Sequence, residues 1–430
     1  MSFGEKILAY KEDILQDLAH VVAIESVSVY GEEKPQQALK YVLQRAEEMG
    51  LTTKIIDNLI GHAEYGDGEK LCGVLTHLDV VPSGEGWTYE PFRLTRADGR
   101  LYGRGVADDK GSAIIALYCL KALKDNGIHS PDNRIRVIFG TNEETGMTDV
   151  KHYFSREPLP DIGFTPDSDY GICSCEKGIL QISLTGSNKN SIITFAEGGN
   201  AVNAVPDKAV FVVNDEKITS MGKASHAMEP HKGINAITKG LQEIRTTAES
   251  SKLGDVFRFV ERYISNETDG NLMGVKQSDK RSGELTLNTG IIRADENTAV
   301  VRIDIRYPVS ADFQAILQTI QSKAEEYHLT LTVDNHSVPL DVEENSEIIR
   351  LLTSAYREVT GKSPDIYATG GGTYARSLQN RGVAFGPVFP DDYSNMHKPD
   401  ESLNEEKFFL HAQICLEAMY RMFTDLIKEV

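Results

Sequence analysis

The first part of the sequence alternates short apolar runs with amphipathic stretches. Apolar side chains at helical spacing predict helices at residues 5–24, 36–50 and 110–127, and continuous apolar runs predict buried strands at residues 71–76, 135–140 and 161–165. Because strands and helices alternate, we expect a doubly wound α/β fold with a central, mostly parallel sheet.

A different order of elements begins at about residue 178. The pattern predicts a strand, a helix, two strands, a helix and a strand, at residues 208–214, 234–248, 285–293, 298–307, 312–328 and 329–335. This βαββαβ order is that of a ferredoxin-like α+β domain. A further amphipathic stretch, residues 255–266, is inserted after the first of these helices.

The α/β character returns toward the C-terminus, with helices predicted at residues 345–359 and from about residue 404. We therefore expect one α/β domain made of residues 1–178 and 342–430, with the α+β domain inserted into it at residues 179–341. At 430 residues the chain is long enough for two such domains.

Composition and charge exclude several classes of protein. The formal net charge of −19 argues against binding to nucleic acid or to anionic membranes. No apolar run approaches the roughly 20 residues that span a bilayer, and the acidic start is unlike a signal peptide, so we expect a cytoplasmic protein. The five cysteines form no CxxC pair, which suits a reducing compartment and excludes a structural zinc knot.

The apolar run GVLTHLDVVP, residues 73–82, contains two polar side chains, His77 and Asp79. Residues two apart in a strand point to the same side of the sheet. Two interpretations are open: the pair satisfies itself in the core, or it serves a bound metal, because a metal-bound imidazole commonly donates its other N–H to a carboxylate.

Two pairs of adjacent acidic residues lie next to predicted elements. Asp108 and Asp109 precede the helix at 110–127, and Glu143 and Glu144 follow the strand at 135–140. A helix N-cap uses only one aspartate, which leaves the other for a cation. Paired glutamates are ordinary in a surface turn, but at a strand end one of them can bind a metal while the other acts as a base.

Two further candidates complete a set of metal ligands. Asp167 follows the strand at 161–165, and His397 lies in NMHKPDES, with Glu401 four residues later as an expected orienting partner. Two histidines and several carboxylates at the strand ends of one sheet predict ligands for a pair of divalent ions.

Five motifs, in the order HLDVVP, YGRGVADDKG, TNEETG, TPDSD and MHKPDE, resemble those of a di-zinc metallopeptidase family. That family includes bacterial carboxypeptidases, aminoacylases, desuccinylases and dipeptidases, and the chain is most similar to the PepV-type Xaa-His dipeptidases. The resemblance covers nearly the whole chain and implies a catalytic α/β domain with an inserted lid or dimerisation-type domain.

The resemblance implies a role for each matching residue. Two zinc ions would share one ligand, Asp108, and the complete sets would be His77, Asp108 and Asp167 for one ion, and Asp108, Glu144 and His397 for the other. Oxygen and nitrogen ligands of this kind also admit manganese or cobalt. Asp79 would orient His77, Glu143 would be the general base, and Asp109 would cap the following helix.

The inserted domain carries two further motifs of the family. The stretch GKASHAMEPHKGINA resembles the lid motif, in which His226 would stabilise the oxyanion and contact the substrate. The stretch AEGGNAVNAVPD resembles a segment of the PepV-type branch in which Asn203 would reach the active site. Without the resemblance, an exposed loop histidine and a turn asparagine would be the simpler interpretations.

A substrate carboxylate needs a cationic or N–H-rich partner. Arg302 and Arg306 share one strand face, and Arg306 is nearest to the corresponding family position, although a surface ion pair explains it equally well. In ATGGGTYAR, Gly371 and Gly372 would let main-chain N–H groups approach the substrate terminus.

We therefore expect a dipeptidase that acts on short peptides with a free C-terminal carboxylate. An N-acyl amino acid amidohydrolase of the same fold is the first alternative, and a non-catalytic metal-binding or interaction protein is the second. The length of the inserted domain favours a monomer and leaves a homodimer open.

Overall fold

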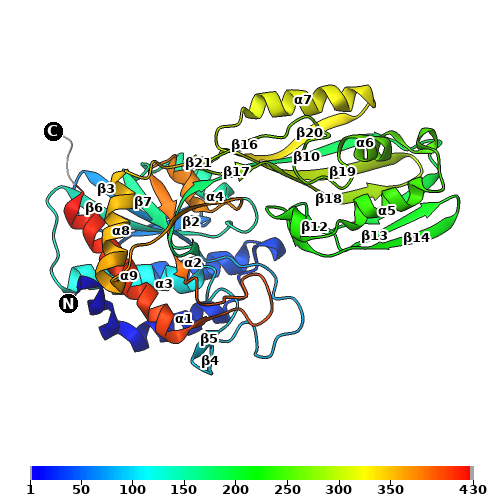
Figure 1. Cartoon of the computed structure of the whole chain (residues 1–430). Helices are drawn as coiled ribbons and strands as arrows, with labels where there is room; N and C mark the ends of the chain where they lie inside the picture. Colours follow the sequence, from blue (N-terminus) through cyan, green and yellow to red (C-terminus); the bar gives the residue numbers. More distant parts are fainter. Residues whose placement is uncertain (1, 427–430) are drawn as a thin grey trace. The chain divides into compact units, whose positions relative to one another are not determined.

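The computed structural model describes residues 2–426, which form two compact units (Figure 1). Unit 1 comprises the described residues up to 174, residues 341–367 and the described residues from 373 onward; unit 2 comprises residues 175–340 and 368–372. The two ends of the sequence therefore build unit 1 together, and most of unit 2 is one continuous segment.

A mixed sheet forms the centre of unit 1. Its strand order is β1-β2-β6-β3-β7-β23-β9-β21, with β22 beside β9. Strands β6, β3, β7 and β23 run parallel, whereas β1 and β2 are antiparallel additions. The bounds are β1 Thr52–Ile56, β2 Ile60–Tyr65, β3 Lys70–His77, β6 Asn133–Gly140, β7 Ile162–Thr165, β9 Ile172–Glu176, β21 Leu340–Asp341, β22 Ile366–Thr369 and β23 Gly382–Ala384.

Helices cover both faces of this sheet, as expected of a doubly wound fold. On one face, α3 packs on β3 and β6, and the Cys72 thiol of β3 donates to the Met422 carbonyl of α9. On the other face, Leu75 and Ile138 pack against α4 and the 3-10 segment Tyr374–Leu378. The helices are α1 Lys11–Ala23, α2 Glu33–Glu48, α3 Lys110–Asp125, α4 Thr148–Phe154, α8 Glu347–Thr360 and α9 Glu405–Asp425.

An antiparallel sheet forms the frame of unit 2, in the order β14-β13-β11-β18-β19-β10-β20. The bounds are β10 Gly178–Ser187, β11 Ile193–Gly198, β13 Lys208–Val213, β14 Glu216–Met221, α5 Ala236–Arg245, α6 Asp255–Tyr263, β18 Thr286–Ala294, β19 Thr298–Tyr307, α7 Phe313–Glu326 and β20 Thr330–Ser337. The predicted βαββαβ elements are present, and β10, β11 and β14, which the sequence analysis did not predict, extend the sheet.

Alternation along β19 divides the two faces of this sheet. Val301, Ile303 and Ile305 are buried in one core with apolar residues of α5, α6 and α7. The residues that alternate with them, among them Asp304 and Arg306, therefore point to the opposite face.

No helix among the described residues has both the length and the apolar character that crossing a membrane requires.

Candidate metal centre

Three parallel strands of unit 1 end at one edge of the sheet. His77 is the last residue of β3 and lies beside Gly140, the last residue of β6. Glu143 and Glu144 lie in the turn that follows β6, and Asp167 follows β7. The carboxyl ends of parallel strands are where open α/β sheets bind their ligands, and three predicted segments meet there.

Asp108 lies between the two predicted histidine ligands. Its Oδ1 is 2.9 Å from His77 Nε2 and its Oδ2 is 2.9 Å from His397 Nε2. His397 Nε2 is also 3.4 Å from Glu144 Oε1. One carboxylate therefore faces two imidazoles, one through each oxygen, which is the arrangement expected of a ligand that bridges two ions.

The environment of His77 suits a metal ligand. The ring is 1% exposed, and its Nδ1 lies 2.9 Å from the main-chain oxygen of Asp79, to which it donates. Its Nε2 faces Asp108 but makes no hydrogen bond of acceptable geometry within the described chain. A buried ring nitrogen that faces a carboxylate in this way is positioned to share a cation with it.

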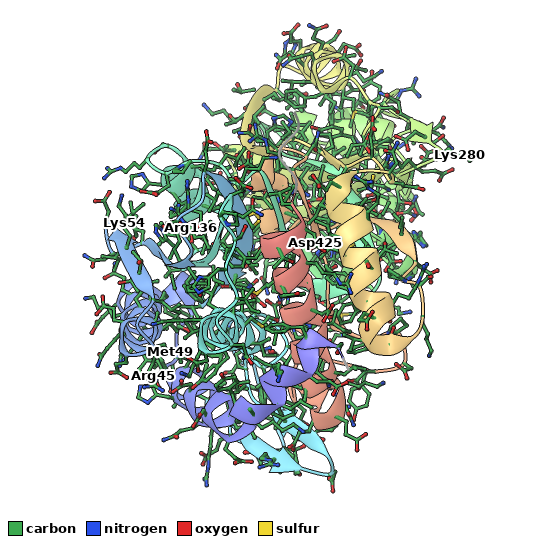
Figure 2. The ribbon with its side chains drawn as sticks, turned by 90° about the vertical axis from the view of Figure 1, so that its left-hand side faces the viewer. Arg45, Met49, Lys54, Arg136, Lys280 and Asp425 are labelled. Atoms are coloured by element: carbon green, nitrogen blue, oxygen red, sulfur yellow. The ribbon has the colours of Figure 1, made fainter. Side chains whose placement is uncertain are left out.

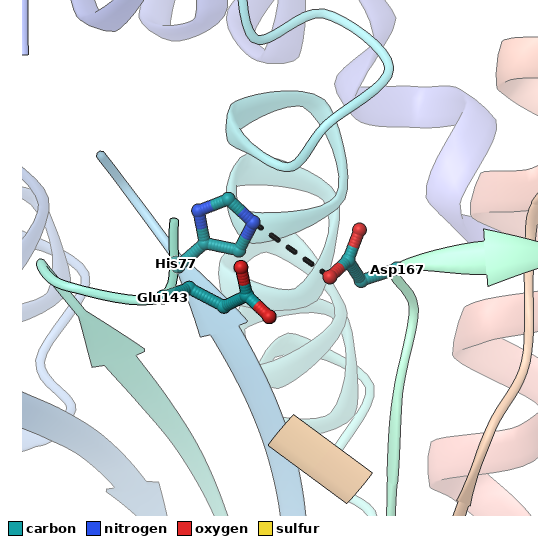
Figure 3. A group of neighbouring side chains, drawn as sticks. All are labelled: His77, Glu143 and Asp167. Carbon is teal, nitrogen blue, oxygen red and sulfur yellow. Dashed lines mark ion pairs between the residues drawn. The ribbon is translucent and has the colours of Figure 1, made fainter. Parts of the chain in front are cut away.

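Glu143 and Asp167 lie beside His77 (Figure 3). Asp167 Oδ2 is 3.7 Å from His77 Nε2. Ligand atoms of His77, Glu143 and Asp167 all lie within 4.8 Å of one another, as do those of His77, Asp108 and Glu144. Five predicted ligands and the predicted base thus converge on one place.

The concentration of carboxylates perturbs the titration of this site. Burial raises the pKa of Asp167 to about 8, and the neighbouring Asp108 carboxylate adds to this shift. Burial also raises the pKa of Glu143 well above its usual range. Burial alone would lower the pKa of His397, yet its bonds to Asp108 and Glu144 raise it to about 11. Without a metal, these carboxyl and imidazole groups therefore retain protons, and a divalent ion that binds there would displace them.

Asp79 contacts more than the histidine that it was predicted to orient. Its Oδ1 is 3.4 Å from His77 Nδ1, whereas the main-chain oxygen of Asp79 is only 2.9 Å from that nitrogen. The carboxylate is completely buried and accepts the main-chain N–H groups of Glu143 and Glu144, at 3.1 and 3.2 Å. Asp79 therefore holds the acidic turn in place.

Two secondary roles predicted from the sequence are wrong. Asp109 occupies the N-cap position of α3, but its carboxylate accepts the His77 main-chain N–H at 3.2 Å and caps no N–H of the helix among the described residues. Glu401 bonds to Arg104 and to main-chain N–H groups of the Asp108 loop, and it makes no bond to His397 in the described part of the chain. Both carboxylates hold the main chain of ligand segments.

The sequence analysis missed two residues that support the acidic turn from its other end. Asp149 Oδ2 accepts the main-chain N–H groups of Thr141 and Asn142, at 2.6 and 3.0 Å, and the Tyr374 hydroxyl at 2.6 Å. The Tyr374 ring also meets the His77 ring edge to face, with centroids 6.2 Å apart. The only signal in the sequence was the place of Tyr374 in ATGGGTYAR, because its partner lies 225 residues away.

Unit 2 brings His226 and Asn203 together. The short strand β15, Ser225–His226, pairs with β12, Ala204–Val205, and the Ala227 N–H donates to the Asn203 carbonyl. Both side chains are exposed. The Met228 N–H donates to His226 Nδ1 at 3.1 Å, so the ring proton resides on Nε2, which makes Nε2 a hydrogen-bond donor.

Unit 2 also places Arg306 beside the glycine-rich segment. The guanidinium is 4% exposed, is held by Asp304 at 2.6 and 3.0 Å, and donates to the Gly370 carbonyl at 3.1 Å. Arg302 instead bonds to Asp334 at the surface. The Gly371 N–H donates to Thr369 Oγ1, so a substrate would have to replace that hydrogen bond. Gly372 is the last residue of the segment 368–372 that belongs to unit 2.

The donor set fits a divalent metal. Two imidazole nitrogens and several carboxylate oxygens match zinc and also manganese or cobalt, whereas the five cysteines are buried and none belongs to the candidate groups found among the described residues. These residues would therefore hold metal through nitrogen and oxygen only.

Comparisons with known proteins agree on one family. The model of peptidase family M20/M25/M40 matches residues 73–421. A Bacillus subtilis protein named "Putative dipeptidase YtjP" is 35% identical, over 98% of this chain and 100% of that protein. In fold, the chain is similar to human carnosine dipeptidase 1, with a TM-score of 0.66, 15% identity and 98% of each chain covered. It is also similar to the aminoacylhistidine dipeptidase of Vibrio alginolyticus, with a TM-score of 0.61 and 16% identity, over 94% of this chain and 96% of that chain.

Proposed function

Because the chain belongs to peptidase family M20/M25/M40, and is thus a metallopeptidase by family, we propose that it hydrolyses dipeptides or short peptides with a free C-terminal carboxylate. We propose two divalent ions, most simply zinc, held by His77, Asp108, Glu144, Asp167 and His397. The observation that carries this proposal is Asp108, whose two oxygens each lie 2.9 Å from a different histidine. Relatives named as dipeptidases support the choice of substrate.

Glu143 is the proposed general base. Bound divalent ions polarise a scissile carbonyl and lower the pKa of water. Glu143 accepts the proton of the attacking water and passes it to the leaving amine. Asp79 fixes the main chain of Glu143 and so keeps the base in place.

Unit 2 would act as the lid and unit 1 as the catalytic domain. His226 would donate from Nε2 to the oxyanion, because Met228 holds the proton there. Asn203 lies next to it on the paired strand and would bind the substrate. Arg306 would bind the substrate carboxylate, since Asp304 presets the plane of its guanidinium. The preferences for a monomer and for the cytoplasm stay predictions.

A substrate panel tests this proposal against the first alternative. The purified chain is loaded separately with zinc, cobalt or manganese, its metal content is measured by elemental analysis, and dipeptides are compared with N-acetyl and N-succinyl amino acids. We expect two ions per chain and turnover of dipeptides. Turnover of N-acyl amino acids alone would identify an amidohydrolase, and no turnover with both ions bound would favour a binding protein.

Glu143→Gln separates metal binding from chemistry. The amide cannot accept a proton, so we expect kcat to fall by roughly 10²–10⁴-fold while both ions stay bound. Steady-state kinetics and elemental analysis of the same preparation measure the two effects. Wild-type turnover in this variant would remove Glu143 from the mechanism.

A further inference from the structure

Glu401 is a buried carboxylate whose two oxygens are both occupied. The side chain is 1% exposed. Its Oε1 accepts the main-chain N–H groups of Gly105, Ala107 and Asp108, at 2.9, 2.9 and 3.2 Å, and its Oε2 accepts the Arg104 guanidinium at 2.6 Å. Its own carbonyl accepts the Gly103 N–H at 3.0 Å. The loop that carries Asp108 is therefore wrapped around one carboxylate.

Arg104 extends this network to a third segment. The guanidinium is 1% exposed, and its Nη2 donates to the carbonyls of Pro82 and Ser83, both at 3.2 Å. It also lies over the Trp87 ring, 5.2 Å from the centroid. Residues 82 and 83 continue the chain that leaves β3 after His77 and Asp79. One buried ion pair thus joins the segments that carry His77, Asp108 and His397.

We propose that Glu401 and Arg104 are positioning residues that set the spacing of the two metal sites, a role that rests on the proposed function. Neither side chain is a metal ligand; they act through the main chain of the ligand segments. Because Asp108 faces both histidines, a displacement of its loop changes both sites at once. His397 depends on its loop in particular, since its side chain is 54% exposed and pairs with Asp108 and Glu144.

A matched ion pair elsewhere in unit 1 provides the control. Arg136 and Glu157 lie 3.0 Å apart and are each 7% exposed, and Lys54 also pairs with Glu157. Figure 2 labels Arg136 and Lys54 among the side chains of the molecule. Arg136 bonds to side chains, those of Glu64, Tyr153 and Glu157. Neutralising Glu157 removes one carboxylate partner of a buried arginine, as neutralising Glu401 does, although Glu64 still pairs with Arg136. Unlike the change at Glu401, it releases no main-chain N–H of a ligand segment.

The test compares Glu401→Gln with Glu157→Gln in the full chain. Each is stripped with a chelator, and zinc affinity and stoichiometry are measured by competition with a chromophoric chelator. Cobalt absorption spectra report the geometry of the site. We expect Glu401→Gln to bind at least one ion 10–100-fold more weakly and to change the cobalt spectrum, as outer-shell substitutions do. Glu157→Gln should lower the melting temperature and keep zinc affinity within about twofold.

A second variant guards against misfolding. Arg104→Lys keeps the positive charge but loses the fork that reaches Pro82 and Ser83, so we expect a smaller loss of zinc affinity than in Glu401→Gln. Wild-type zinc binding in both variants would overturn the positioning role alone, with the proposed function intact. A wild-type chain that binds no divalent ion would overturn both.

Discussion

The two histidines that face Asp108 differ in how they are held. The His77 ring is 1% exposed and fixed by the Asp79 carbonyl, whereas the His397 side chain is 54% exposed. Ligands with firm outer-shell partners keep their orientation without the metal. At the scale of single residues, Asp79 and Asp149 support the site without being candidate ligands, because they accept main-chain N–H groups of the acidic turn.

Asp79→Asn tests this division of roles. The amide has one oxygen in place of two, so one of the N–H groups of Glu143 and Glu144 loses its acceptor and the turn loosens. We expect kcat to fall by roughly 10–100-fold with most of the metal retained. His77→Ala should instead lose metal in elemental analysis. Equal metal loss in the two variants would contradict the distinction.

The candidate ligands could be proposed from the sequence because their motifs are local. Asp108, Glu144 and His397 each lie in a short segment that resembles the family. Glu401 and Tyr374 were misjudged or missed, because their partners lie 297 and 225 residues away and depend on the folded chain. Hydrogen bonds between residues so far apart leave no pattern in sequence spacing.

At the scale of elements, periodicity located most of the α-helices but fewer than half of the strands in the described part of the chain. Helix α3 was predicted at 110–127 and spans Lys110–Asp125, and β6 was predicted at 135–140 and spans Asn133–Gly140. Strand β10 was missed although Leu180, Ile182 and Leu184 alternate with half-buried residues, because its start coincides with the change of character near residue 178. Strand β1 was missed because it is short and mostly exposed, which weakens the hydrophobic signal.

Helix α9 carries a buried histidine that makes the fold sensitive to acid. His411 is 1% exposed, its Nδ1 lies 2.9 Å from the Tyr170 hydroxyl, and burial lowers its pKa to about 3. The unfolded chain binds a proton that the folded chain rejects, so the stabilising contribution is present above pH 6.5 and is lost as pH falls toward 3. The expected slope is about 1.4 kcal/mol per pH unit.

His411→Gln checks this contribution. Urea unfolding at pH 7.5, 6 and 5 should show a shallower decrease of the free energy of unfolding than in the wild-type chain. The variant is less stable at pH 7.5, where the packing of the ring is lost, and the difference narrows toward pH 5. Parallel pH dependences would mean that His411 is not the titrating group.

At the scale of the whole molecule, the candidate residues fall into two groups. The candidate metal ligands, Asp79 and Glu143 belong to unit 1, and His226, Asn203, Arg306 and the glycine-rich segment belong to unit 2. The family resemblance implies one reaction for all of these residues. The proposed metal sites use residues of unit 1 alone.

Removing the metal should destabilise the chain. An ion that binds only the folded state adds about 2.7 kcal/mol at a free concentration 100 times its Kd. We expect a lower melting temperature in EDTA than in zinc, and faster amide exchange in residues 105–110 and 141–146 without the metal. Identical melting curves in EDTA and zinc would contradict a metal site of this affinity.

The place where the chain leaves and rejoins unit 1 has a consequence for protein engineering. The Val342 N–H donates to the Ser174 carbonyl at 2.9 Å, so the two crossings lie side by side on β9 and β21. A short turn between these residues would close unit 1 after excision of the intervening segment. Exchange of unit 2 by gene fusion would also need a new connection in place of Ala368–Gly372, which belongs to unit 2.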